Sequence, residues 1–312
     1  MNKNILFLKL SSFVLSSLCS HINSYMSKIM SIIQKQTLYL SEQFADIRET
    51  IQSQAAFSNL SSICSFNERK KSLTFKTEKI HPEKPPKNTK SVVLLFSNPH
   101  PLSVRAGMYL SESRSQAFWK RLFACECMQP SKELSDSISQ WNSNTIDILS
   151  SNLLNQTYSD QITLFFDCLE SLPTNQYLDL NKIFKKKNGK ELRKKILQNP
   201  GLEHLHCVSK KNNITSWVVF SVQAYRNIIG TKNIAKNAPK RIRSAIDQYY
   251  LEKDSDHFWH ILNDLKSTII INNFEITTVY LSLIARCKND KTPDGRRYFT
   301  LMLDQIFKDI TG

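Results

Sequence analysis

Glycine is scarce in this sequence, with only 6 among 312 residues. Parallel α/β enzymes and β-sandwiches use glycine at turns and phosphate-binding loops, so the scarcity favours helices joined by polar loops. The GxGxxG and Walker A patterns are also absent, which argues against a nucleotide-binding enzyme of those classes. We therefore expect a mainly α fold, a helical bundle of many short helices with an N-terminal helical extension.

Acidic residues are also few relative to basic ones. The chain has 27 acidic against 42 basic residues, for a formal net charge of +15. Such an excess predicts an anionic partner: nucleic acid, an anionic membrane surface or an acidic protein. The seven cysteines are odd in number and widely scattered, which indicates reduced thiols in the cytoplasm and not a disulfide framework.

Long apolar runs are limited to the N-terminus, where Lys3 precedes an apolar segment at 5–19. This segment has the length of a signal-peptide core, but it is too short to span a bilayer, which needs about 20 residues. Two interpretations stay open for residues 1–20. One is a cleaved signal peptide, and the other is a helix that packs on the protein or touches a membrane.

Four regions follow from the patterns along the chain. Residues 1–66 carry apolar positions at helical spacing and predict amphipathic helices. Residues 67–91 are rich in lysine and proline and predict a basic linker. Residues 92–158 begin with the one strand-like run, VVLLF, and then predict a helical support region, while residues 159–312 predict a further helical domain.

Some cysteines and histidines have part of the spacing of a zinc site: Cys125 and Cys127; His204, His206 and Cys207; His257 and His260. Structural zinc sites pair two clusters whose ligands lie two to four residues apart. Cys125 and Cys127 are separated by one residue and lack a partner pair. His257 and His260 are not part of an HExxH pattern. We interpret these as core cysteines and surface histidines, and we expect no metal, no other cofactor and no covalent catalytic dyad.

The densest basic cluster comprises Lys185, Lys186, Lys187, Lys190, Arg193, Lys194 and Lys195. One interpretation is a solvated loop and helix face. Another is a contact with an anionic membrane, where each cation contributes about 1 kcal/mol. Nucleic acid is a weaker alternative, because the cluster lacks the interleaved aromatic residues of a single-strand binder.

Four short pieces occur in an order typical of one family. They are DQITLFFDCLESL at 160–172, NPGL at 199–202, NNITSWV at 212–218 and INNFEITTVYLSLI at 271–284. Together they resemble the Cdc25-homology domain of Ras-family guanine-nucleotide exchange factors. The resemblance is partial, since the helical hairpin and closing motif that follow the last piece in the family have no counterpart before Gly312.

This resemblance implies a helical domain, here residues 159–312, that binds a Ras-type small GTPase and promotes GDP release without covalent chemistry. It places Asn272, Asn273 and Phe274 on the GTPase-binding face, and Trp217 and Leu169 in the core. Because the hairpin region is missing, binding without exchange is an alternative. The second hypothesis is a helical adaptor that binds an anionic membrane at the cytoplasmic face. The third is a nucleic-acid-binding protein.

Overall fold

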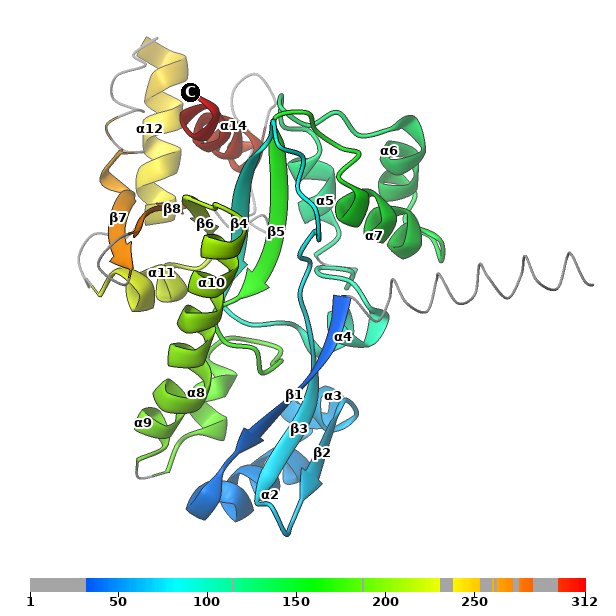
Figure 1. Cartoon of the computed structure of the whole chain (residues 1–312), viewed down its shortest axis with the longest axis vertical. Helices are drawn as coiled ribbons and strands as arrows, with labels where there is room; N and C mark the ends of the chain where they lie inside the picture. The colour runs from blue at the N-terminus through cyan, green and yellow to red at the C-terminus, as the bar shows by residue number, and fades with distance from the viewer. Residues whose placement is uncertain are drawn as a thin grey trace, which may run out of the picture.

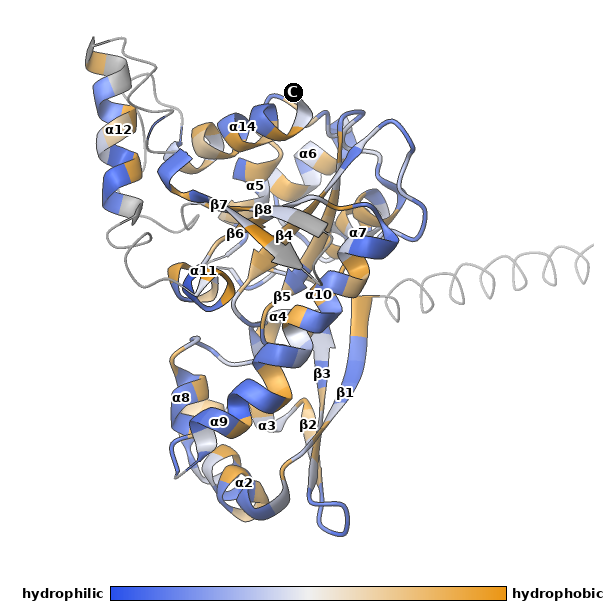
Figure 2. Cartoon of the chain, turned by 60° about the vertical axis from the view of Figure 1, so that its left-hand side comes forward, coloured by the Kyte–Doolittle hydropathy of each residue, from blue (hydrophilic) through white to orange (hydrophobic). Residues whose placement is uncertain are grey.

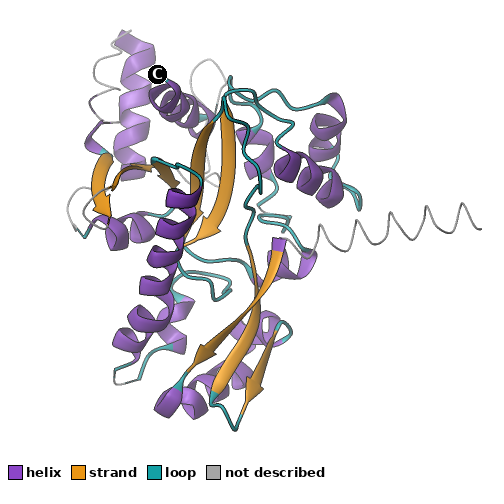
Figure 3. Cartoon of the chain, viewed as in Figure 1, coloured by secondary structure: helices purple, strands orange, loops and turns teal. Residues whose placement is uncertain are grey.

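The structure is a computed structural model that describes residues 32–113, 115–186, 188–230, 238–252, 260, 263–271, 275–282 and 297–312. It has two lobes (Figure 1). The large lobe contains a five-stranded sheet and the small lobe a three-stranded sheet, and helices cover both (Figure 3). The fold is therefore mixed α/β.

The sheet of the large lobe has the order β5-β4-β6-β8-β7. The first four strands in this order are parallel, and β7 is antiparallel to β8. Every residue of β5 is buried, as expected for a parallel strand that is covered on both faces. The strands are β4 (Lys90–Phe96), β5 (Ile162–Cys168), β6 (Ser216–Val219), β7 (Lys266–Ile271) and β8 (Glu275–Leu281).

Helices connect these strands, because parallel neighbours need long crossovers. Between β4 and β5 lie α4 (Pro101–Ala106), α5 (Ala117–Leu122), α6 (Lys132–Ser139) and α7 (Thr145–Asn155). Between β5 and β6 lie α8 (Asp179–Ile183), α9 (Gly189–Arg193), a π-helical segment (Lys194–Gln198) and α10 (Asn199–Lys211). Three further helices described in the large lobe are α11 (Val222–Ile229), α12 (Ala238–Glu252) and α14 (Tyr298–Thr311).

The two faces of the sheet are packed differently. On the face covered by α5 and α14, an aromatic cluster forms in which Phe118 lies 5.6 Å from Phe220 and 5.5 Å from Phe299 between ring centroids. On the opposite face, Trp217 of β6 lies against α10 and donates a 2.9 Å hydrogen bond to Ser209. Figure 2 shows α14 and α5 on one side of the sheet and α10 and α11 on the other.

The small lobe is an antiparallel sheet of order β1-β3-β2 with a hydrophobic core of its own. That core includes Leu180 and Phe184 from the segment of α8 and α9, so this excursion of the chain belongs to the small lobe. The elements are β1 (Ile33–Tyr39), α2 (Phe44–Ser53), α3 (Ser58–Ser61), β2 (Cys64–Asn67) and β3 (Ser72–Glu78).

The expected helical bundle is wrong. The pieces at 160–172 and 212–218 contain β5 and β6 and not the expected helices, and β8 lies within 271–284. Buried parallel strands are continuous apolar runs, which periodicity alone does not separate from buried helix. Scarce glycine was also misleading, because other residues occupy left-handed turn positions: Ser41, Lys71, Leu110, Gln156, Asn188 and Asn213 have positive φ.

Three of the four regions expected from the sequence contain other elements than those expected. Within 1–66 the described part has the helix α2, but β1 and β2 accompany it. The expected linker at 67–91 contains β3, and the domain expected at 159–312 carries four of the five strands of the large sheet. Residues 1–31 lie outside the described residues. Within the described part of the chain, none of the helices combines the length and apolar character needed to cross a membrane.

Candidate functional site

Asp167 occupies the end of β5, on the sheet face that α10 covers, and only 1% of it is exposed. Its two carboxylate oxygens have different neighbours. Oδ1 accepts a 2.7 Å hydrogen bond from the backbone N–H of Cys168 and lies 3.9 Å from the ammonium of Lys79. Oδ2 lies 3.0 Å from Nε2 of His81 and 3.1 Å from Nε2 of His204. Two imidazoles therefore converge on one carboxylate oxygen.

Backbone pairing between the lobes positions His81. The preceding residue, Ile80, exchanges two hydrogen bonds with Phe166 of β5, at 3.0 and 2.9 Å. This bridge holds the chain that leaves β3 beside the end of β5 and presents the next side chain to Asp167. The His81 ring then stacks on His204, with centroids 5.5 Å apart and an interplanar angle of 15°.

A close helix–loop contact positions His204. Gly201 lies one turn earlier on α10, and a Cβ atom there would be 1.9 Å from the carbonyl oxygen of Leu169, the second residue after Asp167. Only glycine permits this approach. Because side chains three residues apart share a helix face, the same contact turns His204 toward Asp167. The π-helical segment Lys194–Gln198 leads directly into this helix, and π-bulges are frequent at functional sites.

The electrostatics of the cluster favour the ionised carboxylate. Burial alone raises the pKa of Asp167, but the nearby His204, His81 and Lys79 outweigh it and hold that pKa well below its usual range. Nε2 of His204 is buried and has no hydrogen-bond partner among the described residues, although it lies 3.1 Å from Oδ2.

The three side chains form a donor set suited to a metal ion. Their ligand atoms lie within 4.8 Å of one another, and they are the only such group of three among the described residues. Two imidazole nitrogens and a carboxylate suit zinc, or iron with open positions. In a tetrahedral zinc site with bonds of about 2.0–2.1 Å, ligand atoms lie about 3.3 Å apart, close to the observed distances to Oδ2. Cys168 and Lys79 orient the carboxylate through Oδ1, which leaves Oδ2 for a metal.

A cavity of about 630 Å³ lies beside the cluster, and we name it the interlobe cavity. Its walls come from β1, the loop after β5 and the segment that leads into α10. His204 and Lys79 line it together with Lys195. A cavity of this size between two lobes accommodates a small molecule. The candidate metal site and a cationic cavity are therefore adjacent.

The basic cluster expected as one membrane-binding face is divided by the fold. Lys186 forms a 2.7 Å ion pair with Asp46, and Arg193 is buried against Glu170. Lys195 lines the interlobe cavity, and Lys187 lies outside the described residues. The remaining lysines, Lys185, Lys190 and Lys194, line a separate cavity. Membrane binding by this cluster stays a prediction.

The residues expected to contact a GTPase, Asn272, Asn273 and Phe274, lie outside the described residues, between β7 and β8. The core placement expected for Trp217 and Leu169 is confirmed, since both are fully buried. GTPase binding and exchange stay predictions. Nucleotide release from purified Ras-, Rap- and Ral-type GTPases tests them, and unchanged release rates without complex formation would contradict them.

The cysteine and histidine pairs noted in the sequence do not form zinc sites among the described residues. Burial raises the pKa of the Cys127 thiol to about 12 and that of Cys125 well above its usual range. Cys125 is buried and Cys127 is partly buried, and neither belongs to a group of three possible metal ligands among the described residues. The Cys207 side chain is exposed, the His206 ring faces Trp217, and His257 is outside the described residues.

His81 and Asp167 were missed from the sequence, and His204 was considered with the wrong partners. A signal for Asp167 does exist, because an acid ends the apolar run ITLFFD. Ligands bind at the carboxyl ends of strands in open α/β sheets, but the run was interpreted as a helix. His81 and Asp167 are 86 residues apart in the sequence, and local patterns do not reveal a contact over that distance.

Comparison with known proteins adds no family to this description. No protein-family model matches the chain, and no curated protein matches it.

Proposed function

We propose that this chain is a metal-dependent hydrolase in which His81, Asp167 and His204 hold a zinc-type divalent ion. One observation carries the proposal: three ligand atoms from three separate segments lie within 4.8 Å of one another beside a cavity. Catalytic zinc sites usually use three protein ligands and keep a fourth position for water or substrate. The exposed fractions of the two imidazoles, 22% and 36%, leave the cluster open to solvent on one side.

The protein groups around the cluster have separable roles in this proposal. A bound metal would supply Lewis acidity and an activated water. Lys79 is buried beside Asp167, where it offsets the carboxylate charge and holds Oδ1. Lys195 lines the interlobe cavity, where its charge attracts an anionic substrate. We therefore infer an anionic ester or amide as the substrate class.

Metal titration tests the proposal. The apo protein, prepared with a chelator, is titrated with Zn²⁺, Mn²⁺ and Fe²⁺ by calorimetry, and bound metal is measured by mass spectrometry. We expect one equivalent per chain, and at least about 100-fold weaker binding in His81→Ala and His204→Ala, because each removes a ligand. His260→Ala, an exposed histidine outside the cluster, is the matched control and leaves affinity unchanged.

The competing explanation is a purely structural cluster of hydrogen bonds and charges around Asp167. It predicts that the same variants lose thermal stability without any change in metal binding. Hydrolysis of carboxylic and phosphoric esters, measured with and without the bound metal, separates a catalytic from a structural metal. Metal binding without hydrolysis of any such substrate would limit the function to metal binding.

A further inference from the structure

A second cavity, of about 510 Å³, lies at the carboxyl edge of the large sheet. We name it the edge cavity. In the order β5-β4-β6, the chain leaves β4 toward β5 on one side and later returns to β6 on the other. Such a reversal of strand order opens a crevice beyond the carboxyl ends of the strands, where open α/β folds bind ligands. The edge cavity draws its walls from the chain after β5 and from α11 after β6.

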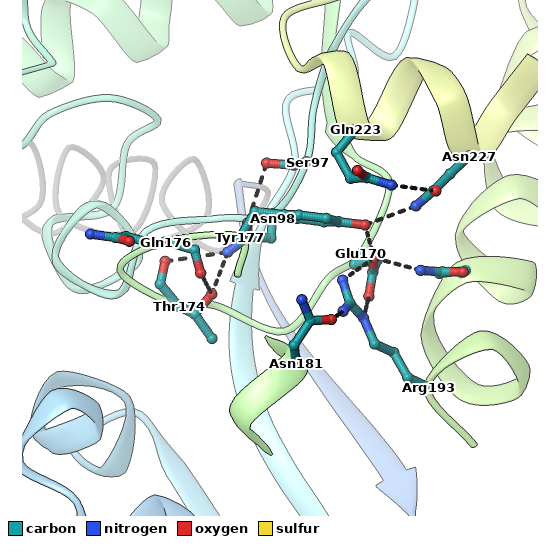
Figure 4. A network of polar contacts seen from close by, with 11 residues as sticks. Ser97, Asn98, Glu170, Thr174, Gln176, Tyr177, Asn181, Arg193, Gln223 and Asn227 are labelled. Atoms are coloured by element: carbon teal, nitrogen blue, oxygen red, sulfur yellow. Dashed lines mark hydrogen bonds and ion pairs between the residues drawn. The ribbon is translucent and has the colours of Figure 1, made fainter. Parts of the chain in front are cut away.

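Glu170 organises the floor of the edge cavity. This carboxylate is fully buried and accepts hydrogen bonds from Arg193 Nε at 2.6 Å and Nη2 at 2.7 Å. Gln198 donates to it at 3.0 Å and the Tyr177 hydroxyl at 2.5 Å. The bidentate arginine neutralises the buried charge. Figure 4 shows Arg193 and Tyr177 converging on Glu170.

The network continues from the floor into the opposite wall. Asn227 of α11 donates to the Tyr177 hydroxyl at 2.9 Å, and Gln223 donates to Asn227 at 3.0 Å. Arg193 Nη1 donates to Asn181 at 2.5 Å, and its guanidinium lies 4.8 Å from the centre of the Tyr177 ring. Side chains from α8, α9 and α11 are thus fixed by one another (Figure 4). The result is a rigid polar surface whose ion pair carries no net charge.

The rim of the edge cavity is cationic. Lys185, Lys190 and Lys194 line it, against the single acidic rim residue Glu191. Within the described part of the chain, these three lysines form no ion pair, unlike the neighbouring Lys186. Their charge is therefore available to a ligand, while that of Arg193 is not.

We propose that the edge cavity binds a small phosphorylated molecule, with its phosphate on the rim lysines and its polar remainder against the amides of Gln198, Gln223 and Asn227. Lysine binds phosphate as a point charge, and the amides offer hydrogen bonds to hydroxyl or base groups. The volume fits a ligand of nucleotide or sugar-phosphate size. The site is separate from the His81–Asp167–His204 cluster and does not depend on a metal there.

The concave arrangement favours a soluble phosphate over a membrane. A flat anionic surface contacts cations that project from one convex face, whereas these lysines surround a cavity. Of the other described residues of the basic cluster, Lys186 and Arg193 are paired and Lys195 lines the interlobe cavity. A lipid headgroup carries the same phosphate chemistry, so the experiment must separate the two sources.

The experiment measures binding of pyrophosphate, adenosine monophosphate and anionic phospholipid vesicles to the metal-free full chain by calorimetry and co-sedimentation. It uses His81→Ala protein so that anions do not bind through a metal. We expect saturable binding of the soluble phosphates, weakened at least about tenfold in Lys190→Ala/Lys194→Ala because two cations contact one phosphate. Lys210→Ala/Lys211→Ala, at the exposed end of α10, removes the same charge elsewhere and leaves affinity unchanged.

A variant of the cavity wall and the pattern of probe binding separate a phosphate site from general charge attraction. Gln223→Ala changes the wall of the cavity. This variant is expected to weaken the binding of adenosine monophosphate more than that of pyrophosphate, because only adenosine monophosphate has a polar remainder besides its phosphate. If the two double lysine variants weaken the binding of the phosphates equally, the attraction is non-specific and the proposal is overturned. Binding to vesicles alone assigns the lysines to a membrane and also overturns it, as does the absence of binding to every probe. Thermal melting confirms that each variant is folded.

Discussion

Gly201 packs so tightly against Leu169 that a Cβ atom would lie 1.9 Å from the Leu169 carbonyl oxygen. This contact joins α10 to the loop after β5 and thereby holds His204 beside Asp167. The candidate metal centre thus depends on a residue that has no donor atom of its own.

Gly201→Ala is expected to separate α10 from the loop and displace His204. Overpacking at a close contact costs about 1–3 kcal/mol, so we expect a lower free energy of unfolding in urea together with weaker metal binding. Gly230→Asn is the control, since Gly230 has φ +70° with open space around it and asparagine tolerates that conformation. Unchanged metal affinity in Gly201→Ala would show that this contact does not position His204.

Arg193→Met is expected to destabilise the protein strongly. It leaves the fully buried Glu170 without its ion-pair partner, and an uncompensated buried charge costs about 3–5 kcal/mol. Denaturant unfolding measures the loss as a lower midpoint. Lys186→Met, which breaks the exposed pair with Asp46, is the matched control and leaves the midpoint close to wild type. Similar midpoints for both variants would contradict the role given to the Glu170 network.

The thiols are expected to differ in reactivity according to burial. Burial raises the pKa of Cys64 to about 11 and that of Cys127 to about 12, above the usual thiol value. The thiolate is the nucleophile, so both stay protonated at pH 8, and their alkylation accelerates only as the pH approaches these values. Among the five cysteines that the structure describes, peptide mass spectrometry after iodoacetamide treatment is expected to show the exposed Cys207 modified first. Rapid modification of Cys127 at pH 8 would contradict its burial.

Particular elements show what the sequence could and could not predict. The strand at 92–96 was predicted because its run VVLLF is apolar and β-branched and ends at an NPHP turn. The run ITLFF at 162–166 has the same character, yet the family resemblance led to a helix assignment. Local patterns carry little information here, because a parallel strand forms only when distant neighbours pair with it.

The candidate site was harder to predict than the fold. His204 was recognisable as a possible ligand, but its partners come from the β3–β4 connection and the end of β5. Their approach depends on the Ile80–Phe166 bridge and the Gly201–Leu169 contact. Neither contact leaves a spacing pattern in the sequence, so no short motif could have assembled the cluster.

Thermal melting of the apo protein with and without Zn²⁺ tests the central claim most directly. At a free metal concentration about 100 times Kd, binding to the native state adds about 2.7 kcal/mol of stability, which raises Tm by about 4 °C for a chain of 312 residues. We predict that rise in the wild-type protein and in His260→Ala, and its loss in His81→Ala and His204→Ala. An identical Tm with and without metal in the wild-type protein, or an equal rise in all four proteins, would contradict a metal centre at His81, Asp167 and His204.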